Sequence, residues 1–466
     1  MFLGALVFIV GMASLGAEIA GVRLLSPYFG ASTVVWANTI GVVLVALSIG
    51  YWLGGRAADR RPRVEPLCVV ALAAAALLAV VPFAAHPLLD AGVKALDAVS
   101  AGAFVGSLLA VLVLIALPVM LLGMVAPWAL RLAVASVDEA GTVAGRLYAL
   151  STGGSLVGTL LSALLLIPAV GTRRTFLAFA ICLAVVAAIG LRRERRVLGV
   201  PVAIGALLAL PADVAKPAAD ARVIYEKETA YQYARVIENA NGERRLELNE
   251  GHAVHSLYRP GTVLTDDYWD AMYTDAGNPR SVAILGNAAG TTARAFRTLR
   301  PGTRVDAVEI DPELTRIGRR WFGLPRSVRV HHEDARPFLR RRSDSRWDAI
   351  LVDAYRQPYI PFYLVTKEFF QLVRDRLTRN GMVVVNVGHP ERSNALERAM
   401  TATMRSVFRD VRRDPAMPTN TILVAGREAR GARLRPSLRG GETYTDDRAP
   451  VEWLIDRSLV EYAATP

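Results

Sequence analysis

The sequence predicts an α-helical membrane region followed by an α/β domain with a doubly wound, mostly parallel sheet. Runs of eighteen or more apolar residues with few charges fill the chain before about Pro211, as membrane-spanning helices require. Beyond that point strand and helix patterns alternate, which is typical of a parallel sheet covered by helices. The stretch from Ser281 to Pro312 shows this best, because an apolar strand, a glycine turn, a helix and a second apolar strand follow one another.

The composition narrows the class of protein. The 466 residues are 53% hydrophobic, which is too apolar for one water-soluble domain, and the chain is too long for a single core. The formal net charge is +12, but only four of the 54 basic residues are Lys, so a general preference for Arg explains the charge. No RNA-binding aromatic motif, zinc pattern or recognition helix is present, and we expect no nucleic-acid partner. Cys68 and Cys182 lie in apolar runs and predict neither a disulfide nor a metal site.

Six apolar segments are long enough to cross a membrane. The first, Met1 to Val22, lacks a basic leader and a clear cleavage site, so we expect a retained helix. A seventh apolar run, Val197 to Leu210, has about fourteen residues, a length that favours a re-entrant or interfacial segment. The other predicted spans are residues 34–55, 65–88, 103–126, 148–170 and 174–191. Close helix packing is predicted for the span 148–170 by its small residues, Gly153, Gly154, Ser155, Gly158 and Ser162.

Short basic loops predict the orientation of these spans. Four Arg lie between Arg56 and Arg63 and four more between Leu191 and Arg196, so both loops should face the cytoplasm. The first loop, within GYWLGGRAADRRPR, resembles the loop between the second and third helices of major-facilitator transporters, of which this region would be half. With six spans and a seventh segment that does not cross, we expect a multi-pass protein of the plasma membrane whose soluble half is cytoplasmic.

Four segments organise the chain in this prediction. They are a membrane domain at residues 1–211, a linker rich in Pro, Ala and Asp at 212–221, a small β subdomain with a helix at 222–280, and a larger α/β domain at 281–466. Strands are predicted at 222–226, 232–238 and 244–249, the last two joined by the hairpin signal Asn-Ala-Asn-Gly. A helix at 262–276 carries Tyr268 and leads into the central strand.

Helices and strands keep alternating after the central unit. Helices are predicted at 312–320, 335–341, 366–378 and 394–406, and strands at 327–331, 348–353, 382–387 and 420–425. In such a sheet, ligands bind beyond the carboxyl ends of the strands. The residues expected there are Asn287 in the loop from Gly286 to Gly290, Glu309 and Asp311 after the second strand, Asp334 after the third and Asp353 after the fourth. A single carboxylate at a strand end is more often a helix cap than a catalyst, but the repeated placement is harder to attribute to capping.

The glycine loop indicates the kind of cofactor. The spacing Gly-Asn-Ala-Ala-Gly is neither Gly-x-Gly-x-x-Gly nor a phosphate P-loop. A cofactor without phosphates fits better, and Glu309 stands where such folds place an acid against the ribose hydroxyls. S-adenosylmethionine and its decarboxylated form both meet this description. An ordinary βαβ crossover with a glycine turn is the alternative reading.

The soluble half resembles the spermidine synthase family of aminopropyltransferases, in the bacterial type that is fused behind several membrane spans. The resemblance covers roughly Tyr225 to Leu454 and rests on the order of several short motifs. These are ETAYQYARV, LELNEG, Tyr268-Trp269-Asp270, VAILGNAAG, VEIDP, HEDA, DAILVDAY and TDDRAPVE. It implies a Rossmann-like fold of the class I methyltransferase type, with residues 281–466 as the cofactor-binding catalytic domain.

The resemblance also implies roles for individual residues. Asp353 would accept the proton of the attacking amine, and Tyr268 would orient that amine. The implied cofactor-binding residues are Gln232, Gly286, Asn287, Gly290, Glu309 on the ribose hydroxyls, Asp311, Asp334 on the adenine amine, and Ala335. No metal is implied. The acceptor would be a small amine resembling putrescine, and a homodimer is compatible with the family.

Three functions stay open at this point. The first is transfer of an aminopropyl group from decarboxylated S-adenosylmethionine to an amine, as in polyamine biosynthesis. The second is a methyltransferase using S-adenosylmethionine on a small substrate, which is favoured by two departures from the family: Ala289 where an Asp is usual, and Arg356 in the loop after Asp353. The third is a ligand-binding domain without turnover, coupled to a transporter-like membrane half.

Overall fold

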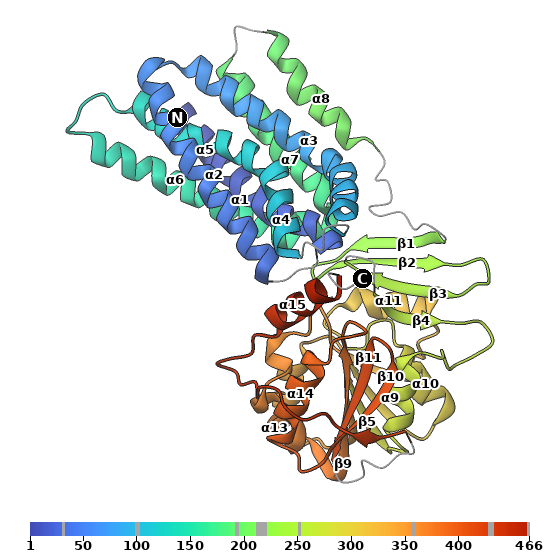
Figure 1. Ribbon diagram of the computed structural model, residues 1–466. Helices are drawn as coiled ribbons and strands as arrows, with labels where there is room; N and C mark the ends of the chain where they lie inside the picture. The colour runs from blue at the N-terminus through green and yellow to red at the C-terminus, as the bar shows by residue number, and fades with distance from the viewer. Residues whose placement is uncertain are drawn as a thin grey trace. The chain divides into compact units, whose positions relative to one another are not determined.

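A computed structural model describes residues 1–29, 33–97, 103–191, 195–210, 221–249, 253–356, 359–426 and 433–463. The chain falls into two compact units. The helical unit comprises residues 1–217 together with 228–232, and the α/β unit comprises residues 218–227 and 233–466. Figure 1 shows helices alone in the first and a mixture of strands and helices in the second. The expected order, helical region and then α/β region, is confirmed.

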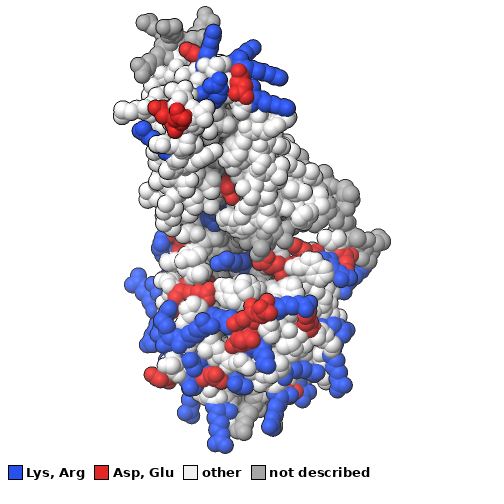
Figure 2. Space-filling model, turned by 90° about the vertical axis from the view of Figure 1, so that its left-hand side faces the viewer, with Lys and Arg blue, Asp and Glu red and all other residues white. Residues whose placement is uncertain are grey.

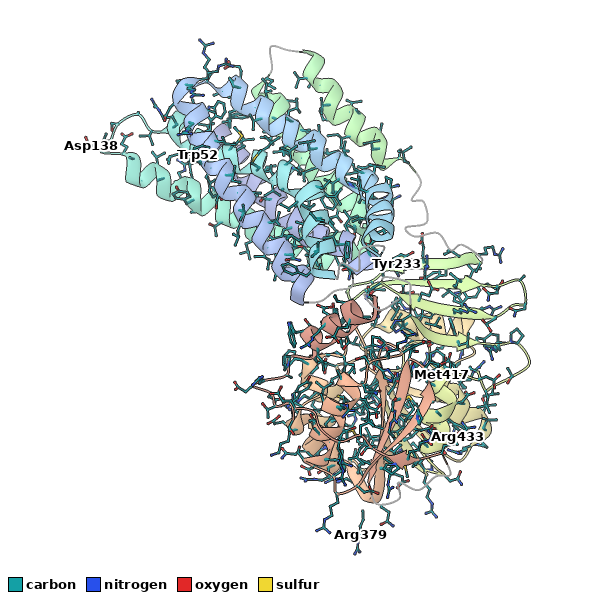
Figure 3. All side chains as sticks on the ribbon, in the orientation of Figure 1. Trp52, Asp138, Tyr233, Arg379, Met417 and Arg433 are labelled. Atoms are coloured by element: carbon teal, nitrogen blue, oxygen red, sulfur yellow. The ribbon has the colours of Figure 1, made fainter. Side chains whose placement is uncertain are left out.

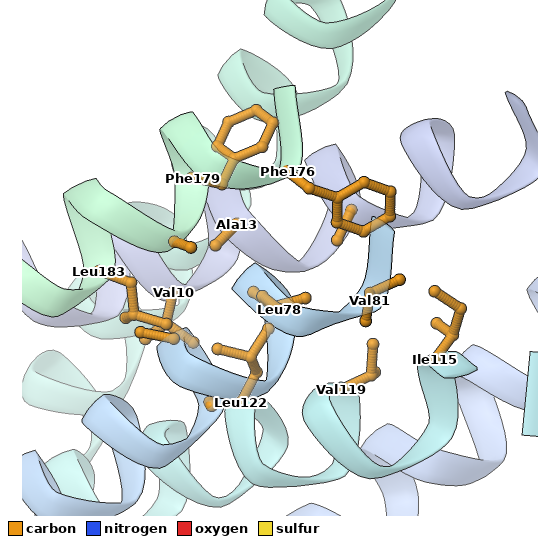
Figure 4. Close-up of a cluster of buried hydrophobic side chains, with 14 of the residues drawn as sticks. Val10, Ala13, Leu78, Val81, Ile115, Val119, Leu122, Phe176, Phe179 and Leu183 are labelled. Atoms are coloured by element: carbon orange, nitrogen blue, oxygen red, sulfur yellow. The ribbon is translucent and has the colours of Figure 1, made fainter. Parts of the chain in front are cut away.

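The helical unit consists of long apolar helices around a shared core. Its helices are α1 (Phe2–Phe29), α2 (Thr33–Arg60), α3 (Val64–Asp97), α4 (Ala103–Val111), α5 (Leu117–Ala133), α6 (Ala140–Leu161), α7 (Ile167–Gly190) and α8 (Gly199–Leu208). Single π-helical turns join α4 to α5 and α6 to α7. Val10, Leu78, Val119, Phe176 and Phe179 meet in the core, each fully or almost fully buried (Figure 4).

Small residues set the closest helix contact in this unit. A Cβ added at Gly154 or Gly158 of α6 would overlap the carbonyl oxygen of Phe8 or Met12 on α1. Ser162 Oγ donates to the carbonyl of Gly16 at 3.2 Å, which satisfies a hydroxyl that would otherwise be costly in an apolar core. The predicted packing of this small-residue face is therefore confirmed.

Five helices are long and apolar enough to cross a membrane within the described residues. The last of them covers Ala140–Gly190, 51 residues, and is broken at Gly171, whose φ of 83° and ψ of 166° are not helical. Only glycine adopts this backbone conformation readily. The two arms on either side of Gly171 correspond to the predicted spans 148–170 and 174–191. The break therefore reconciles five continuous helices with six predicted segments.

The seventh predicted segment contains α8, a helix of ten residues that is shorter than the five helices able to span a membrane, so its failure to cross stays a prediction. Val197 lines the same cavity as Gly190, at the C-terminal end of α7. At the other end of the segment, the Arg173 guanidinium donates to the carbonyl of Leu210 at 2.7 Å. The segment thus runs antiparallel to α7. Ile204 is the one buried residue of α8, at 4% exposed, so the helix packs on the outside of the helical core (Figure 1).

The α/β unit contains two sheets. The small antiparallel sheet has the order β1-β2-β3-β4, with β1 (Arg222–Glu228), β2 (Tyr233–Glu238), β3 (Arg244–Leu248) and β4 (Val254–Tyr258). The first three strands were predicted and the fourth was missed. The large sheet has the order β12-β10-β11-β9-β8-β5-β6-β7. Its parallel strands are β5 (Ser281–Leu285), β6 (Arg304–Val308), β7 (Arg329–His331), β8 (Trp347–Val352) and β9 (Leu377–Gly388).

Three antiparallel strands extend the large sheet beyond β9. They are β10 (Val411–Met417), β11 (Asn420–Gly426) and β12 (Arg435–Pro436), of which only β11 was predicted. The sheet is therefore mixed, with a parallel half and an antiparallel edge. This edge brings Asn420, at the start of β11, opposite Gly388 at the end of β9.

Helices cover both faces of the large sheet, as a doubly wound fold requires. They are α9 (Tyr268–Asp275), α10 (Thr291–Leu299), α11 (Pro312–Trp321), α12 (Ala335–Arg341), α13 (Lys367–Asp375), α14 (Ala395–Arg405) and α15 (Val451–Ala463). Along β9, Val383 and Val385 pack with Phe369 of α13, while Val384 packs on the opposite face with Phe296 of α10. This alternation is the period of two expected for a strand buried on both sides.

The carboxyl ends of β5 and β8 touch. Asp353 N–H donates to the Leu285 carbonyl at 2.8 Å, which continues the ladder between the two strands. Gly286, the next residue after β5, has a φ of 89°, and a Cβ there would overlap the carbonyl oxygen of Asp353. Only glycine satisfies both the positive φ and the close approach.

We expect Gly286→Ala to destabilise the α/β unit by about 2–5 kcal/mol, because it adds backbone strain and a steric overlap at one position. The unfolding midpoint of the α/β unit in the full chain should fall by roughly 4–20 °C. Gly302→Ala is the matched control, since a Cβ there meets no heavy atom within 4 Å. Equal midpoints for the two variants would contradict the close contact between the strand ends.

Candidate active site

The loop after β5 forms a tight turn that starts α10. Gly290 adopts a left-handed conformation, with φ of 91°, and its N–H donates to the Asn287 carbonyl at 2.8 Å. Ala288 also has a positive φ, 45°. Ser256 of β4 accepts a hydrogen bond from the N–H of Ala289 at 3.0 Å, so the small sheet holds the loop from one side. The predicted glycine turn between strand and helix is present.

Glu309 lies under this loop at the end of β6. Its carboxylate accepts hydrogen bonds from the N–H of Ala288 at 2.7 Å and of Asp311 at 3.0 Å. The side chain is buried, and burial raises the pKa of Glu309 to about 7, although the backbone donors favour the charged form. Glu309 therefore ties the loop to the end of the neighbouring strand and places an acid directly beside the turn.

The side chain of Asn287 is buried with its hydrogen-bonding groups unsatisfied in the described part of the chain. It is 6% exposed, and neither its Oδ1 nor its Nδ2 has a hydrogen-bond partner among the described residues. A buried amide without partners costs about 1–3 kcal/mol for each unsatisfied group. The residues at this strand edge thus fit a ligand with polar groups such as ribose hydroxyls, for which Asn287 offers one donor and one acceptor.

Asp311 and Asp334 both cap helices. Asp311 accepts from the N–H of Glu313 at 2.9 Å at the start of α11. Asp334 accepts from the N–H of Arg336 at 2.9 Å at the start of α12, and the Tyr363 hydroxyl donates to its second oxygen at 2.6 Å. Capping accounts for these contacts. Ala335, the first residue of α12, is 7% exposed and packs in the core.

Asp353, itself half-buried, is the centre of a polar cluster at the end of β8. Asn386 of β9 donates its Nδ2–H to Asp353 Oδ1 at 2.8 Å, and the Tyr268 hydroxyl of α9 donates to Oδ2 at 3.3 Å. Asn420 of β11 in turn donates to Asn386 Oδ1 at 2.9 Å. Burial raises the pKa of Asp353 to about 7, while its hydrogen bonds hold the shift down. The predicted pair, Tyr268 and Asp353, is therefore brought together.

Tyr355 closes one side of this cluster. Its hydroxyl donates to the Asn386 carbonyl at 3.1 Å and accepts from the N–H of Gly388 at 2.6 Å. Burial raises the pKa of Tyr355 far above its ordinary value. Both bonds end on β9, so the loop after Asp353 is fixed to the neighbouring strand. Arg356, the next residue, is exposed.

The acids before and within α9 are structural. Asp267 is the N-cap residue and accepts from the N–H of Tyr268 at 2.6 Å. Asp270 reaches back and accepts from the N–H of Thr265 at 2.8 Å and of Asp266 at 2.7 Å. This reciprocal capping fixes the first turn of α9 and with it the backbone position of Tyr268.

The structure also shows where Ala289 and Gln232 lie. Ala289 is fully buried among apolar residues that include Ala234 and Leu314, so its side chain faces a core and opens no space beside a ligand. Gln232 lies in the turn after β1, where its N–H donates to Thr229 Oγ1 at 3.0 Å. It belongs to a different compact unit from the glycine loop, so its role in cofactor binding stays a prediction.

The sequence analysis missed two residues of the polar cluster. Asn386 could have been predicted, because a single amide in the apolar run Val383-Val384-Val385-Asn386-Val387 indicates a buried polar side chain with a specific partner. Asn420 carries no such signal, since it sits in a turn-like sequence and reaches the cluster only through antiparallel pairing of β11 with β9.

Comparisons with known proteins agree with this geometry. Residues 270–423 match the family model of the spermine/spermidine synthase domain. A probable polyamine aminopropyl transferase of Bifidobacterium longum is 32% identical over 193 residues, covering 41% of this chain and 43% of that protein. A polyamine aminopropyltransferase of Vibrio vulnificus is 35% identical over 134 residues, covering 28% of this chain and 44% of that protein.

This chain thus spans less than half the length of these two curated relatives. Among solved structures, a probable spermidine synthase from Corynebacterium glutamicum is 24% identical, with a TM-score of 0.38, covering 45% of this chain and 81% of that one. The matched residues 270–423 hold the glycine loop, Glu309, Asp353 and Asn386. Residues 270–423 of the α/β unit therefore match the spermine/spermidine synthase domain.

Proposed function

We propose that the α/β unit is an aminopropyltransferase, which moves an aminopropyl group from decarboxylated S-adenosylmethionine to a small amine. The observation that carries the proposal is the cluster of Tyr268, Asp353 and Asn386 at the end of β8, in backbone contact with the glycine loop after β5. A group that takes up a proton thus lies beside a loop suited to a nucleoside. The domain match supports the same activity.

The reaction needs an unprotonated amine and a place for one proton. The sulfonium of the donor makes the adjacent carbon electrophilic. The amine nitrogen forms a bond to that carbon, the carbon–sulfur bond breaks, and its electron pair leaves with sulfur as a neutral thioether. The proton lost by the amine passes to Asp353, and the Tyr268 hydroxyl orients the amine.

Burial adapts Asp353 to this role. With a pKa of about 7, the carboxyl is ionised in slightly alkaline solution and is a stronger base than an exposed Asp. Asn386 donates to Oδ1 of Asp353 at 2.8 Å. The Oδ2 atom, beside the Tyr268 hydroxyl, is therefore the oxygen that can take the proton of the substrate amine. The chain Asn420 to Asn386 to Asp353 fixes this orientation from three strands.

Binding of the aminopropyl donor is assigned to the glycine-loop side of the contact between Gly286 and Asp353. We propose that Glu309 and Asn287 hold the ribose hydroxyls, and that Gly286 and Gly290 let the backbone approach the nucleoside. Asp334, Ala335 and Asp311 flank the same strand edge, and Gln232 completes the set by resemblance. Asp334 would contact the adenine amine in addition to its capping bonds.

We also propose that the helical unit anchors the chain in the plasma membrane and that the α/β unit faces the cytoplasm. Five long apolar helices support an integral membrane protein. Adenosyl sulfonium compounds are made in the cytoplasm, which favours that side for the α/β unit. With six spans and a segment α8 that does not cross, the Arg56 to Arg63 loop lies on the same cytoplasmic side, as its charge predicts.

Glu309→Ala should weaken binding of an adenosyl sulfonium at least tenfold, because it removes a buried acceptor and loosens the loop. Calorimetry of the full chain with S-adenosylmethionine and with its decarboxylated form measures this. Asp344→Ala, at an exposed position, is the control and should bind as the unchanged protein does. Tighter binding of the carboxylated cofactor would favour a methyltransferase, and unchanged affinity in Glu309→Ala would remove the site.

The rate should fall as the pH drops through about 7, because protonation removes the base form of Asp353. Asp353→Asn should lower turnover by about 10²–10⁴-fold, which is the usual contribution of a general base, and the inflection near 7 should disappear. Rates measured from pH 5.5 to 9 with saturating amine test both points. An unchanged rate and profile in Asp353→Asn would show that another group accepts the proton.

Cysteine labelling tests the topology. In a Cys68→Ala, Cys182→Ala background, a Cys at Asn241 and a Cys at Arg61 should both resist a membrane-impermeant thiol reagent in intact cells. Equal protection is expected because six spans and a segment α8 that does not cross put both positions on the cytoplasmic side. Labelling at Asn241 alone would show that α8 crosses, and it would separate the α/β unit from its proposed donor.

A further inference from the structure

An open cavity of about 1220 Å³ lies at one end of the helical unit. It is formed by the starts of α1 and α3, the ends of α2 and α7, and the second half of α5. We call it the arginine-end cavity. Charged side chains of Arg60, Arg61 and Glu65 line it together with the apolar side chains of Val70 and Met124. The lining is therefore amphipathic.

Of the four arginines in the loop at residues 56–63, Arg60, Arg61 and Arg63 make no side-chain hydrogen bond or ion pair with another described residue, and the first two of them line the cavity. Arg56 lies over the ring of Trp52 at 3.9 Å, near the end of the bundle where Figure 3 labels that tryptophan. Asp59, which lies between Arg56 and Arg60 in the sequence, forms a salt bridge with Arg131 at 3.4 Å. Within the part of the chain that the structure describes, neither Arg60 nor Arg61 has an ion-pair partner. Both are exposed and both line the cavity.

A buried donor at the cavity wall is also unsatisfied. Trp128 of α5 lines the cavity and is 3% exposed, and its Nε1–H has no acceptor among the described residues. An indole nitrogen is a donor only, so it requires an acceptor atom from a ligand or solvent. The indole N–H of Trp128 thus adds a hydrogen-bond donor to those of the two guanidinium groups.

The charge of the lining matches a single anionic group. Among the described lining residues, two Arg and one Glu give a net charge of +1 (2 − 1), which equals in magnitude the charge of one phosphodiester. Guanidinium groups are suited to phosphate oxygens, which they bind with two parallel hydrogen bonds. The polar part of the cavity is therefore complementary to a phosphodiester headgroup.

The rest of the cavity suits hydrocarbon. Val69 and Ile189, which also line it, are 54% and 44% exposed, so the opening continues onto the outer apolar surface of the helices. Figure 2 shows one face of the helical unit as nearly uncharged along its middle, with charged side chains gathered toward its upper end. A ligand with an anionic head and long apolar chains meets both surfaces at once.

We propose that the arginine-end cavity binds one phospholipid, with its phosphodiester held by Arg60 and Arg61, an ester oxygen accepting from Trp128 Nε1–H, and an acyl chain along Val70 and Met124. The site is separate from the glycine loop and from Asp353, and it does not depend on the proposed transferase activity. Its function is to hold the helical unit at a fixed depth in the lipid, where the headgroup meets the basic loop.

The test uses the full chain, freed of lipid in dodecyl maltoside, with phosphatidylglycerol as the probe. Native mass spectrometry counts bound lipid, and the thermal unfolding midpoint reports stabilisation. Arg60→Gln/Arg61→Gln should bind phosphatidylglycerol at least tenfold more weakly than the unchanged chain. Arg63→Gln/Arg146→Gln removes the same charge at exposed positions outside the cavity and should bind normally.

Two further probes identify the recognised group. Diacylglycerol, which lacks the phosphate, should neither bind as one molecule per chain nor raise the thermal unfolding midpoint. Inorganic phosphate should have no effect at concentrations where the lipid acts. Equal lipid binding by the two double variants would overturn the proposal, as would binding of diacylglycerol equal to that of phosphatidylglycerol. An effect of inorganic phosphate equal to that of the lipid would assign the cavity to a free anion and would also overturn it.

Discussion

The candidate site depends on the contact between Gly286 and the backbone of Asp353. Two parallel strands end side by side, and the residue after one strand has no side chain, so the loop after the other strand can lie against it. This contact brings a turn suited to a nucleoside next to a half-buried carboxylate. Any larger residue at Gly286 would push the two functional elements apart, because the overlap is with main-chain atoms that have no alternative position.

Burial then gives the two acids their chemical character. Glu309 and Asp353 both have pKa values raised to about 7, and in both cases desolvation is the main cause. Their hydrogen bonds differ, however. Glu309 is held by backbone N–H groups of its own loop, whereas Asp353 is held by the side chains of Asn386 and Tyr268. The first arrangement fixes a binding loop, and the second leaves an oxygen beside a hydroxyl that can orient a substrate.

The helical unit is built on a different principle. Its closest contact comes from glycines and serines of α6 packed against main-chain atoms of α1, which is how helices associate where apolar side chains gain little from leaving lipid. Charge is concentrated at an end of the bundle, around Arg60 and Arg61. The two units thus use glycine for the same geometric reason, close main-chain approach, but in one case to pack helices and in the other to join two strand ends.

The sequence by itself determined the class of each unit, the glycine turn, and the positions of Glu309, Tyr268 and Asp353, because hydrophobic period and strand-end placement are local properties of the chain. Tertiary structure decided what local patterns do not contain. The antiparallel edge brought Asn420 to Asn386 and so completed the support of Asp353. Burial of Ile204 and the hydrogen bond from Arg173 to the Leu210 carbonyl lay α8 along α7, a placement that the local sequence did not indicate. In both cases the outcome depends on contacts between residues distant in sequence, and the free energy of those contacts overrides the local signal.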